Sequence, residues 1–468
     1  MEEAGANREA SPGDRRFARL SPLDLSYLQV ESTAWPTHYS GLGILEGQRL
    51  LDDSGRLRLE EVRDRLGRRL GRAPQLRRRL HVPGPGRGRP LWVDDDRFAI
   101  SQHVREAAVP SPGGERELLE TAARIHERLL DRSRPLWELW FLTGLSDGRV
   151  GALLKLHHTV ADGVAAVGLM GAFLSFEPDD ADPAPALWTP EPQPGGWALL
   201  ADNLAGKMRR AGRGVAVVAH PRRVARGLGL LTRLLRRSLG AKGTPRPALN
   251  GVVGPGRIVR FIRLDLAEVK DTARSHGGRV NDVVLALWSG GLRDLLSSRG
   301  EPVAGVEVVT GLTVSLRSAT DPAGGNQVGA IALPLPVGEA DVGRRLDLVI
   351  TAARRAKEDQ DAAAIARLLV AWAATPLARR AMLHQHAVQV FASNLIGPPV
   401  PLYVLGARVL DVFPIGDLRG NVGLFLTALS YAGRMFLAVT ADAGAFPDLD
   451  VLMAGMERGW HALAVTAE

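Results

Sequence analysis

The sequence of 468 residues contains no cysteine. This absence excludes a disulfide framework, a cysteine nucleophile and any metal site built on thiolates. Long apolar runs are also missing: the best candidate for a membrane span, residues 422–441, contains Arg434 and is better explained as two strands. Residues 1–19 are polar and charged, without the apolar core of a signal peptide. We therefore expect a cytoplasmic protein with a disordered N-terminal tail.

The composition is that of an ordinary globular protein, with 45% apolar and 24% charged residues. The length allows two or three domains, and a proline-rich stretch, residues 177–196, marks a linker. Strand and helix patterns on both sides of it predict a mixed α/β fold in two halves. The expected division is a tail at 1–19, a first lobe at 20–176, a linker with a basic segment at 177–250, and a second lobe at 251–468.

Hydrophobic periodicity predicts the individual elements. The expected strands include 38–45, 92–100, 135–142, 306–316, 329–335, 391–395, 402–409, 423–431 and 435–440. The expected helices include 24–28, 57–70, 115–130, 266–276, 281–296, 344–357 and 362–374.

Basic residues are concentrated in one block. Residues 203–264 carry 15 Lys and Arg and no Asp or Glu, more than the whole net charge of +8. Part of the block mixes leucines with arginines at roughly helical intervals, which is typical of an amphipathic helix at an anionic lipid surface. Its arginines are Arg222, Arg223, Arg226, Arg233, Arg236 and Arg237. A solvated helix packed on the second lobe is an equal alternative. Nucleic acid is a weaker one, because no nucleic-acid-binding module is recognisable.

The most distinctive stretch is a pair of histidines at the end of an apolar segment. Residues 153–156 predict a short buried strand, and an apolar helix begins near Asp162. His157 and His158 lie between the two. Neutral imidazole is the side chain best suited to accept a proton near neutral pH. Since adjacent strand residues face opposite sides, only one of the pair can point into a given cleft, and we expect the other to pack.

This stretch, His157-His158-Thr159-Val160-Ala161-Asp162-Gly163, resembles the HHxxxDG motif of acyl-CoA-dependent acyltransferases of the chloramphenicol-acetyltransferase and condensation-domain type. Further segments, in the same order, are similar to motifs of bacterial wax ester synthase/diacylglycerol acyltransferases. They are Pro135-Leu136-Trp137, Asn281-Asp282, residues 314–317, residues 325–328, Ser393-Asn394 with Gly397-Pro398, and residues 401–403. The resemblance runs from about residue 20 to the C-terminus. One departure is the Thr37-His38-Tyr39-Ser40 segment, where the family usually carries a Met-His-Val-Gly-like sequence.

The resemblance implies both a fold and a set of roles. The fold is the two-lobed α/β architecture of these acyltransferases, with an active-site channel between the lobes. His158 is then the general base and His157 an orienting or packing neighbour. Asp162 is structural, and Gly163 leaves room for the channel.

The two supporting motifs have simpler interpretations, which we favour. Pro135, Leu136 and Trp137 are explained as a packing corner, with at most an indirect effect on activity. Asn281 and Asp282 are explained as the cap of an apolar helix. No metal is expected either, because His384 and His386 have no third ligand nearby in the sequence.

No Gly-x-Ser-x-Gly motif is present and cysteine is absent, so a covalent acyl-enzyme has no obvious carrier. The resemblance therefore implies direct transfer of a fatty acyl group from acyl-CoA, a substrate rather than a cofactor, to diacylglycerol or a long-chain alcohol. It also implies peripheral contact with the inner membrane face or lipid droplets. Two alternatives remain: a related transferase acting on another alcohol or an amine, and a non-catalytic lipid-surface protein. The intact histidine motif argues against the last.

Overall fold

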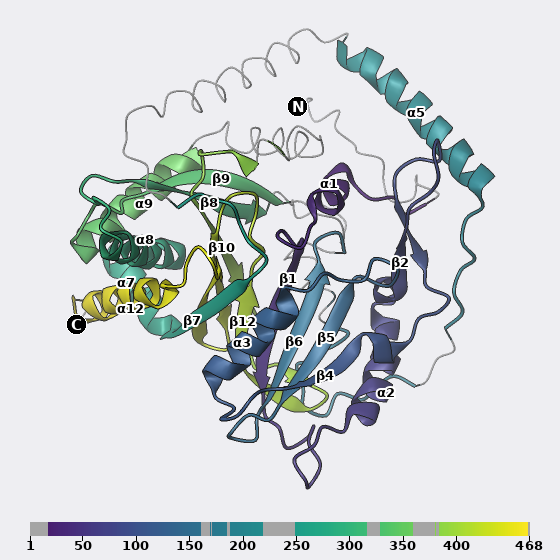
Figure 1. Cartoon of the computed structure of the whole chain (residues 1–468), viewed down its shortest axis with the longest axis horizontal. Coiled ribbons are helices and arrows are strands. Elements are labelled where there is room, and N and C mark those ends of the chain that lie inside the picture. Colours follow the sequence, from purple (N-terminus) through teal and green to yellow (C-terminus); the bar gives the residue numbers. More distant parts are fainter. Residues whose placement is uncertain are drawn as a thin grey trace, which may run out of the picture.

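The computed structural model describes residues 17–160, 169, 171–184, 188–218, 249–315, 328–358, 380 and 383–466. Two six-stranded sheets form the body of the molecule, and helices cover their outer faces (Figure 1). This arrangement confirms the predicted mixed α/β fold in two halves.

The first sheet has the strand order β11-β12-β1-β6-β5-β4. Its strands are β1 (His38–Leu45), β4 (Val104–Ala108), β5 (Trp137–Thr143), β6 (Val150–His157), β11 (Tyr403–Val404) and β12 (Ala407–Ile415). All eight residues of β6 are buried, including Lys155 and His157 in an otherwise apolar strand in the middle of the sheet. β1 is antiparallel to β6, and His38 lies opposite His157. The end of β6 therefore lies beside the beginning of β1.

Helices and short strands surround this sheet. They are α1 (Pro22–Val30), α2 (Leu59–Arg69), α3 (Glu115–His126), the paired strands β2 (Arg78–His81) and β3 (Leu91–Asp94), and the 3₁₀ helices Leu70–Arg72, Pro74–Arg77 and Ile100–Gln102. Two predicted bounds were wrong. The helix 115–130 ends at His126, where the buried ammonium of Lys155 donates to the carbonyls of Ile125 and Arg128. The strand 92–100 ends at Asp94, because the Asp95 carboxylate accepts the amide of Arg97 in a turn.

The second sheet has the order β7-β14-β13-β10-β8-β9. Its strands are β7 (Arg257–Asp265), β8 (Val308–Ser315), β9 (Val328–Leu335), β10 (Val390–Ile396), β13 (Leu424–Tyr431) and β14 (Arg434–Asp442). Its helices are α7 (Leu266–Ser275), α8 (Val280–Ser298), α9 (Val342–Glu358) and α12 (Leu449–Thr466). The α8 helix lies closely against α12, since a Cβ at Gly291 would be 2.6 Å from the carbonyl oxygen of Leu452. The predicted helix 362–374 lies outside the described residues.

One strand from the second half of the chain belongs to the first sheet. β12 is antiparallel to β1, with Ile415 opposite Ser40. The predicted single strand 402–409 was wrong, because the chain turns at Leu405 (φ 51°) and Gly406 (φ 91°) and divides into β11 and β12. Glycine adopts such a φ at little cost. β12 runs in the same direction as β6, so the loop after Ile415 lies at the same end of the sheet as the histidine pair.

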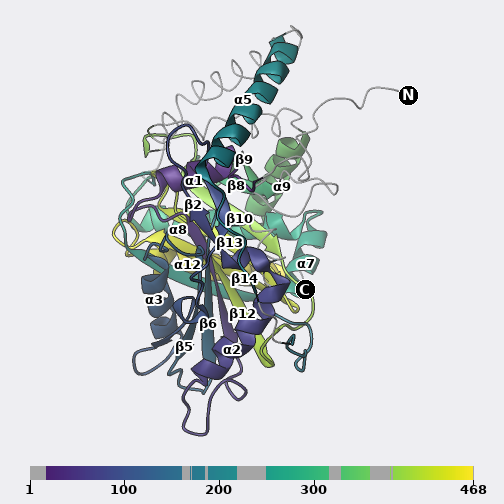
Figure 2. The ribbon, with the colours of Figure 1, turned by 90° about the vertical axis from the view of Figure 1, so that its right-hand side faces the viewer.

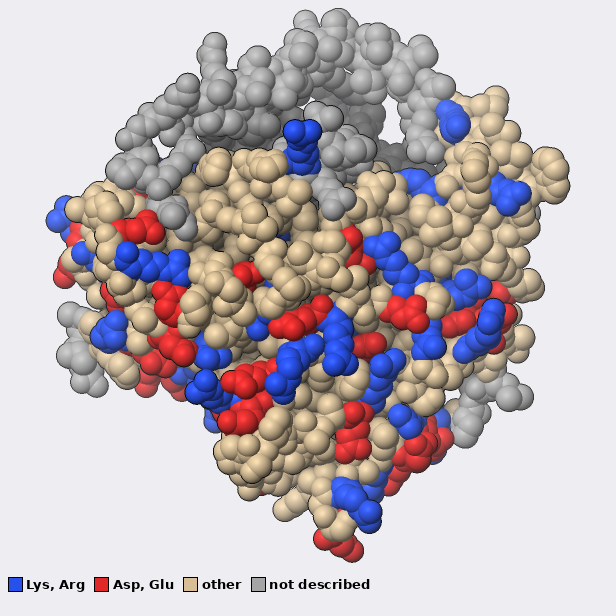
Figure 3. Space-filling view, in the orientation of Figure 1, with Lys and Arg blue, Asp and Glu red and all other residues tan. Residues whose placement is uncertain are grey.

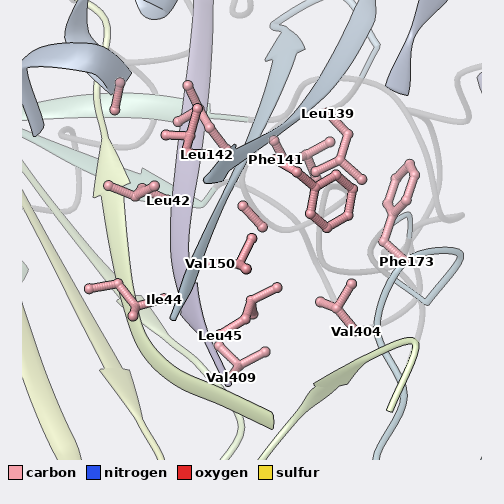
Figure 4. Close-up of a cluster of buried hydrophobic side chains, with 14 of the residues drawn as sticks. Leu42, Ile44, Leu45, Leu139, Phe141, Leu142, Val150, Phe173, Val404 and Val409 are labelled. Atoms are coloured by element: carbon pink, nitrogen blue, oxygen red, sulfur yellow. The ribbon is translucent and has the colours of Figure 1, made fainter. Parts of the chain in front are cut away.

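The hydrophobic core of the first sheet is continuous with the second half of the chain. Figure 4 shows part of it, with aliphatic side chains of β1 and β5 packed beside Val404 and Val409 of β11 and β12. The same cluster includes Val259 of β7 and Phe436 of β14. This shared core fixes the two sheets against each other and so fixes the residues between them.

Helix α5 (Gly196–Val218) follows the proline-rich linker and projects from the body of the molecule (Figure 2). Its first turns are anchored: Leu199 is buried against Leu91 and Val93, and Asp202 forms an ion pair with Arg19 at 2.8 Å. Within the described part of the chain, no helix combines the length and apolar character needed to cross a membrane.

Candidate active site

The histidine pair lies where β6 ends and a turn begins. Two neighbouring segments hold its backbone: the amide of His157 donates to the carbonyl of Leu136 at 3.1 Å, and the amide of His158 donates to the carbonyl of Thr37 at 3.0 Å. Consecutive residues at a strand end project to opposite sides. The two imidazoles consequently enter different surroundings, as the sequence predicts for adjacent strand residues.

The His157 imidazole is enclosed and has partners at both nitrogens. Its Nε2 lies 3.2 Å from a carboxylate oxygen of Glu31 and 2.9 Å from the hydroxyl of Thr37. Its Nδ1 lies 2.8 Å from the Thr159 hydroxyl and accepts the Thr159 amide at 3.1 Å. Burial lowers the pKa of His157, although the nearby Glu31 opposes this. The ring is therefore fixed in place by contacts on both of its nitrogens.

Glu31 continues this network toward the surface. Its carboxylate forms an ion pair with Arg132, with an N···O distance of 2.6 Å. The side chain of Glu31 is only 2% exposed. Burial alone would raise the pKa of Glu31, but the hydrogen bond with His157, together with Arg132, lowers it to about 2. The carboxylate is thus ionised at neutral pH, and its contact with Nε2 orients the His157 ring.

The His158 imidazole is more accessible and is placed between two aromatic rings. The ring of Tyr27, from α1, stacks on it with centroids 4.7 Å apart and planes at 14°. Tyr39, from β1, lies at 4.9 Å in a tilted arrangement. The side chain of His158 retains 11% exposure, whereas that of His157 has none. Of the two histidine side chains, that of His158 is therefore the more accessible.

A charged pair from the loop after β12 completes the surroundings of His158. An oxygen of Asp417 lies 3.1 Å from His158 Nε2, and the Arg419 guanidinium lies 3.5 Å from the same nitrogen. Arg419 also contacts both oxygens of Asp417, at 2.9 and 3.1 Å. Burial alone would raise the pKa of Asp417, but the charges of Arg419 and His158 hold it well below its ordinary range. A buried, ionised carboxylate therefore faces the imidazole.

Glu31, Asp417 and Arg419 are the residues that sequence reasoning missed. Each is far from the histidines along the chain; Arg419 and His158 are separated by 261 positions. The only local signal for the second pair is the sequence Gly416-Asp417-Leu418-Arg419-Gly420, two opposite charges at alternate positions between glycines after an apolar strand.

The Pro135-Leu136-Trp137 segment lies directly behind His157. All three residues are buried, and the Leu136 carbonyl accepts the His157 amide. The Trp137 indole donates to the carbonyl of Leu76 at 2.7 Å and stacks on His103 at 4.6 Å. Its contacts are those of a packing corner that supports the end of β6.

The Asn281-Asp282 pair begins helix α8. The Asp282 carboxylate accepts the amide of Arg279 at 2.8 Å, which caps the helix from its third residue. The side-chain oxygen of Asn281 accepts a hydrogen bond from the side-chain amide of Asn394 on β10 at 3.3 Å. These contacts tie the first turn of α8 to the second sheet.

Several other predicted residues lie outside the described part of the chain. They are Asp162, Gly163, Arg222, Arg223, Arg226, Arg233, Arg236 and Arg237. His384 and His386 are described and exposed. In the segments that the structure describes, no three His, Asp or Glu side chains gather as metal ligands would.

The two-sheet fold is shared by known proteins. The first condensation domain of the calcium-dependent antibiotic synthetase has a TM-score of 0.58 over 96% of both chains, at 16% identity. This similarity defines the class of fold and confirms the predicted condensation-domain-like architecture.

Closer similarities define the family. The wax ester synthase/diacylglycerol acyltransferase from Marinobacter aquaeolei VT8 has a TM-score of 0.69 and 25% identity, covering 96% of this chain and all of that one. A Mycobacterium tuberculosis protein, named as a diacylglycerol O-acyltransferase, is 33% identical over 95% of this chain and 90% of its own length. Family models for the wax ester synthase/diacylglycerol acyltransferase catalytic domain and C-terminal domain match residues 20–284 and 324–464. The chain belongs to this family, as the sequence motifs predict, and the family indicates an acyltransferase.

Proposed function

We propose that the protein transfers a fatty acyl group from acyl-CoA to the hydroxyl of diacylglycerol or of a long-chain alcohol. His158 is the general base. The observation that carries this proposal is the contrast between the two histidines: His157 is enclosed with both nitrogens occupied, whereas His158 is partly accessible and faces an ionised carboxylate. A partly accessible imidazole beside a carboxylate supports the assignment of proton transfer to His158.

The proposed reaction is a direct displacement. His158 accepts the hydroxyl proton while the alcohol oxygen bonds to the thioester carbonyl carbon. The carbon–sulfur bond then breaks, and the imidazolium returns the proton to the departing thiolate of CoA. The products are an ester and free CoA, and His158 is neutral again. Because no cysteine exists anywhere in the chain, a thioester-linked intermediate on the protein is excluded.

We propose further that α5 and the basic segment after it bring the enzyme to an anionic lipid surface, where both substrates partition. Trp197, Leu204 and Met208 are 85%, 51% and 76% exposed, and their spacing of seven and four residues places them on one face of α5. Lys207 and Arg209 flank this face and are exposed. The upper right corner of the molecule in Figure 3, where α5 lies, shows scattered basic side chains among uncharged ones. Exposed apolar and cationic side chains on one helix suit a lipid interface.

An acceptor panel tests the reaction. The purified protein is incubated with radiolabelled acyl-CoA and, separately, diacylglycerol, a long-chain alcohol and a long-chain amine. We expect labelled triacylglycerol or wax ester and no amide. Amide as the main product would support the related transferase instead. Vesicle binding without any labelled product would support a non-catalytic lipid-surface protein.

A further inference from the structure

The loop after β12 is built to present two charges on one side. In extended chain, residues at alternate positions face the same way. Asp417 and Arg419 accordingly both contact His158, while Leu418 between them is buried against Phe425 and Val253. Gly416 lies flat on the Phe425 ring, since a Cβ there would be 2.3 Å from it. The loop is thus anchored on the second sheet while its charges reach a histidine of the first.

The interaction between the two charges is close and shielded from water. The side chain of Asp417 is 3% exposed and that of Arg419 is 19% exposed. Arg419 also lies over the Tyr27 ring, 5.8 Å from its centroid, on the same ring that stacks on His158. Charge interactions at such a site are screened less than at the surface.

We infer that Asp417 and Arg419 are positioning residues that set the pH range in which His158 acts as a base, with opposite effects. This inference rests on the proposed function of His158. The carboxylate, 3.1 Å from Nε2, favours the protonated imidazole that forms during transfer. The guanidinium holds the carboxylate in place and, at 3.5 Å from Nε2, opposes protonation.

The other polar groups around His158 come from three elements. They are Tyr27 of α1, Tyr39 of β1 and His157 of β6. Burial lowers the pKa of His157, so this neighbour is uncharged at neutral pH. Of these neighbours, Asp417 and Arg419 are the ones that carry charge.

The sign of each effect follows from these charges. Without the carboxylate, protonating the imidazole is less favourable, so the base stays active to lower pH. Without the guanidinium, protonation is more favourable, so activity is lost at a higher pH. An opposite charge at this distance shifts a titration by about one pH unit or more.

The test is the pH dependence of kcat/KM, which reports the base in the free enzyme. In Asp417→Asn we expect the acidic limb of the kcat/KM profile, where activity falls as His158 is protonated, to move down by about one pH unit. In Arg419→Gln we expect the same limb to move up by a similar amount. The double variant should return close to the wild-type position, and Arg419→Lys, which keeps the charge, should resemble wild type. Asp450→Asn removes an exposed partner of Arg260 and is the matched control, with no movement expected.

The inference is wrong if the acidic limb of the kcat/KM profile stays in place in both single variants, or moves in the same direction in both. The pair would then have a purely structural role. If Asp417→Asn does not fold, Arg419→Gln and the double variant, which leaves no unpaired buried charge, decide the question. The imidazole titration of His158 is followed independently by ¹⁵N NMR and assigned by its loss in His158→Gln. If the His158 titration shifts in opposite directions in the two single variants but the protein transfers no acyl group, the effect of the two charges on His158 is real and the proposed function is wrong.

Discussion

At the scale of single residues, burial and partners give two adjacent histidines different chemistry. The strand end directs His157 into the core, where Glu31 and Thr159 occupy its nitrogens, and directs His158 toward the loop that carries Asp417. A motif of two histidines therefore contains one enclosed ring and one more accessible ring, to which we assign the proton transfer. The distinction follows from the period of the strand rather than from the residue type.

The buried ion pair of Glu31 predicts a pH-dependent contribution to stability. Its pKa of about 2, against an ordinary 4.5, means that folding favours the ionised form. This stabilisation is present above pH 4.5 and is lost as the pH falls toward 2. Glu31→Gln should thus lower the free energy of unfolding at pH 7 by about 3 kcal/mol, and the difference from wild type should shrink between these pH values.

Denaturant unfolding from pH 7 to pH 3 measures this difference. Glu60→Gln is the control, because Glu60 pairs with Arg63 while 85% exposed, and exposed pairs contribute little. A Glu31→Gln deficit that stays constant across the whole range would show that lost packing, not ionisation, explains it.

At the scale of elements, α5 is anchored at one end and exposed along one face, which predicts a role in lipid binding. The triple variant Trp197→Ser, Leu204→Ser, Met208→Ser should bind anionic vesicles at least about tenfold more weakly, because each side chain loses apolar contact with the lipid. Replacing Arg222, Arg223, Arg226, Arg233, Arg236 and Arg237 by Gln should weaken binding chiefly at low salt, where charge is least screened.

Co-sedimentation with vesicles at low and high salt measures both effects. The control is Val252→Ser, since Val252 is 97% exposed and lies outside α5. Transfer to a short, soluble alcohol should change little in either variant. If both variants pellet like wild type, the lipid contact lies elsewhere on the molecule.

At the scale of the whole molecule, the site is assembled between segments that are distant in sequence. The strand β6, the adjacent β1 and the histidine motif could be predicted from the chain, since each depends on a local apolar pattern. The partners of the histidines could not. Glu31 reaches His157 only because α1 packs beside the first sheet, and Asp417 reaches His158 only because β12 crosses from the second half to pair with β1.

The error in the predicted strand 402–409 combines a local turn with long-range pairing. The apolar residues of 402–409 predict one strand, but positive φ at Leu405 and Gly406 turns the chain there, and pairing with β1 begins only afterwards. Long-range pairing thus decided both the topology and the electrostatics of the site, and neither is encoded in a short window of sequence.

If His158 is the base for acyl transfer, its replacement must slow the reaction, and we would measure kcat/KM of His158→Gln with radiolabelled acyl-CoA and the best acceptor. Melting temperature and circular dichroism verify folding, and His386→Gln, at an exposed site, is the control. We predict a loss of about 10²–10⁴-fold with a folded protein, and wild-type rates for the control. A folded His158→Gln enzyme that keeps most of its activity would show that His158 is not the base.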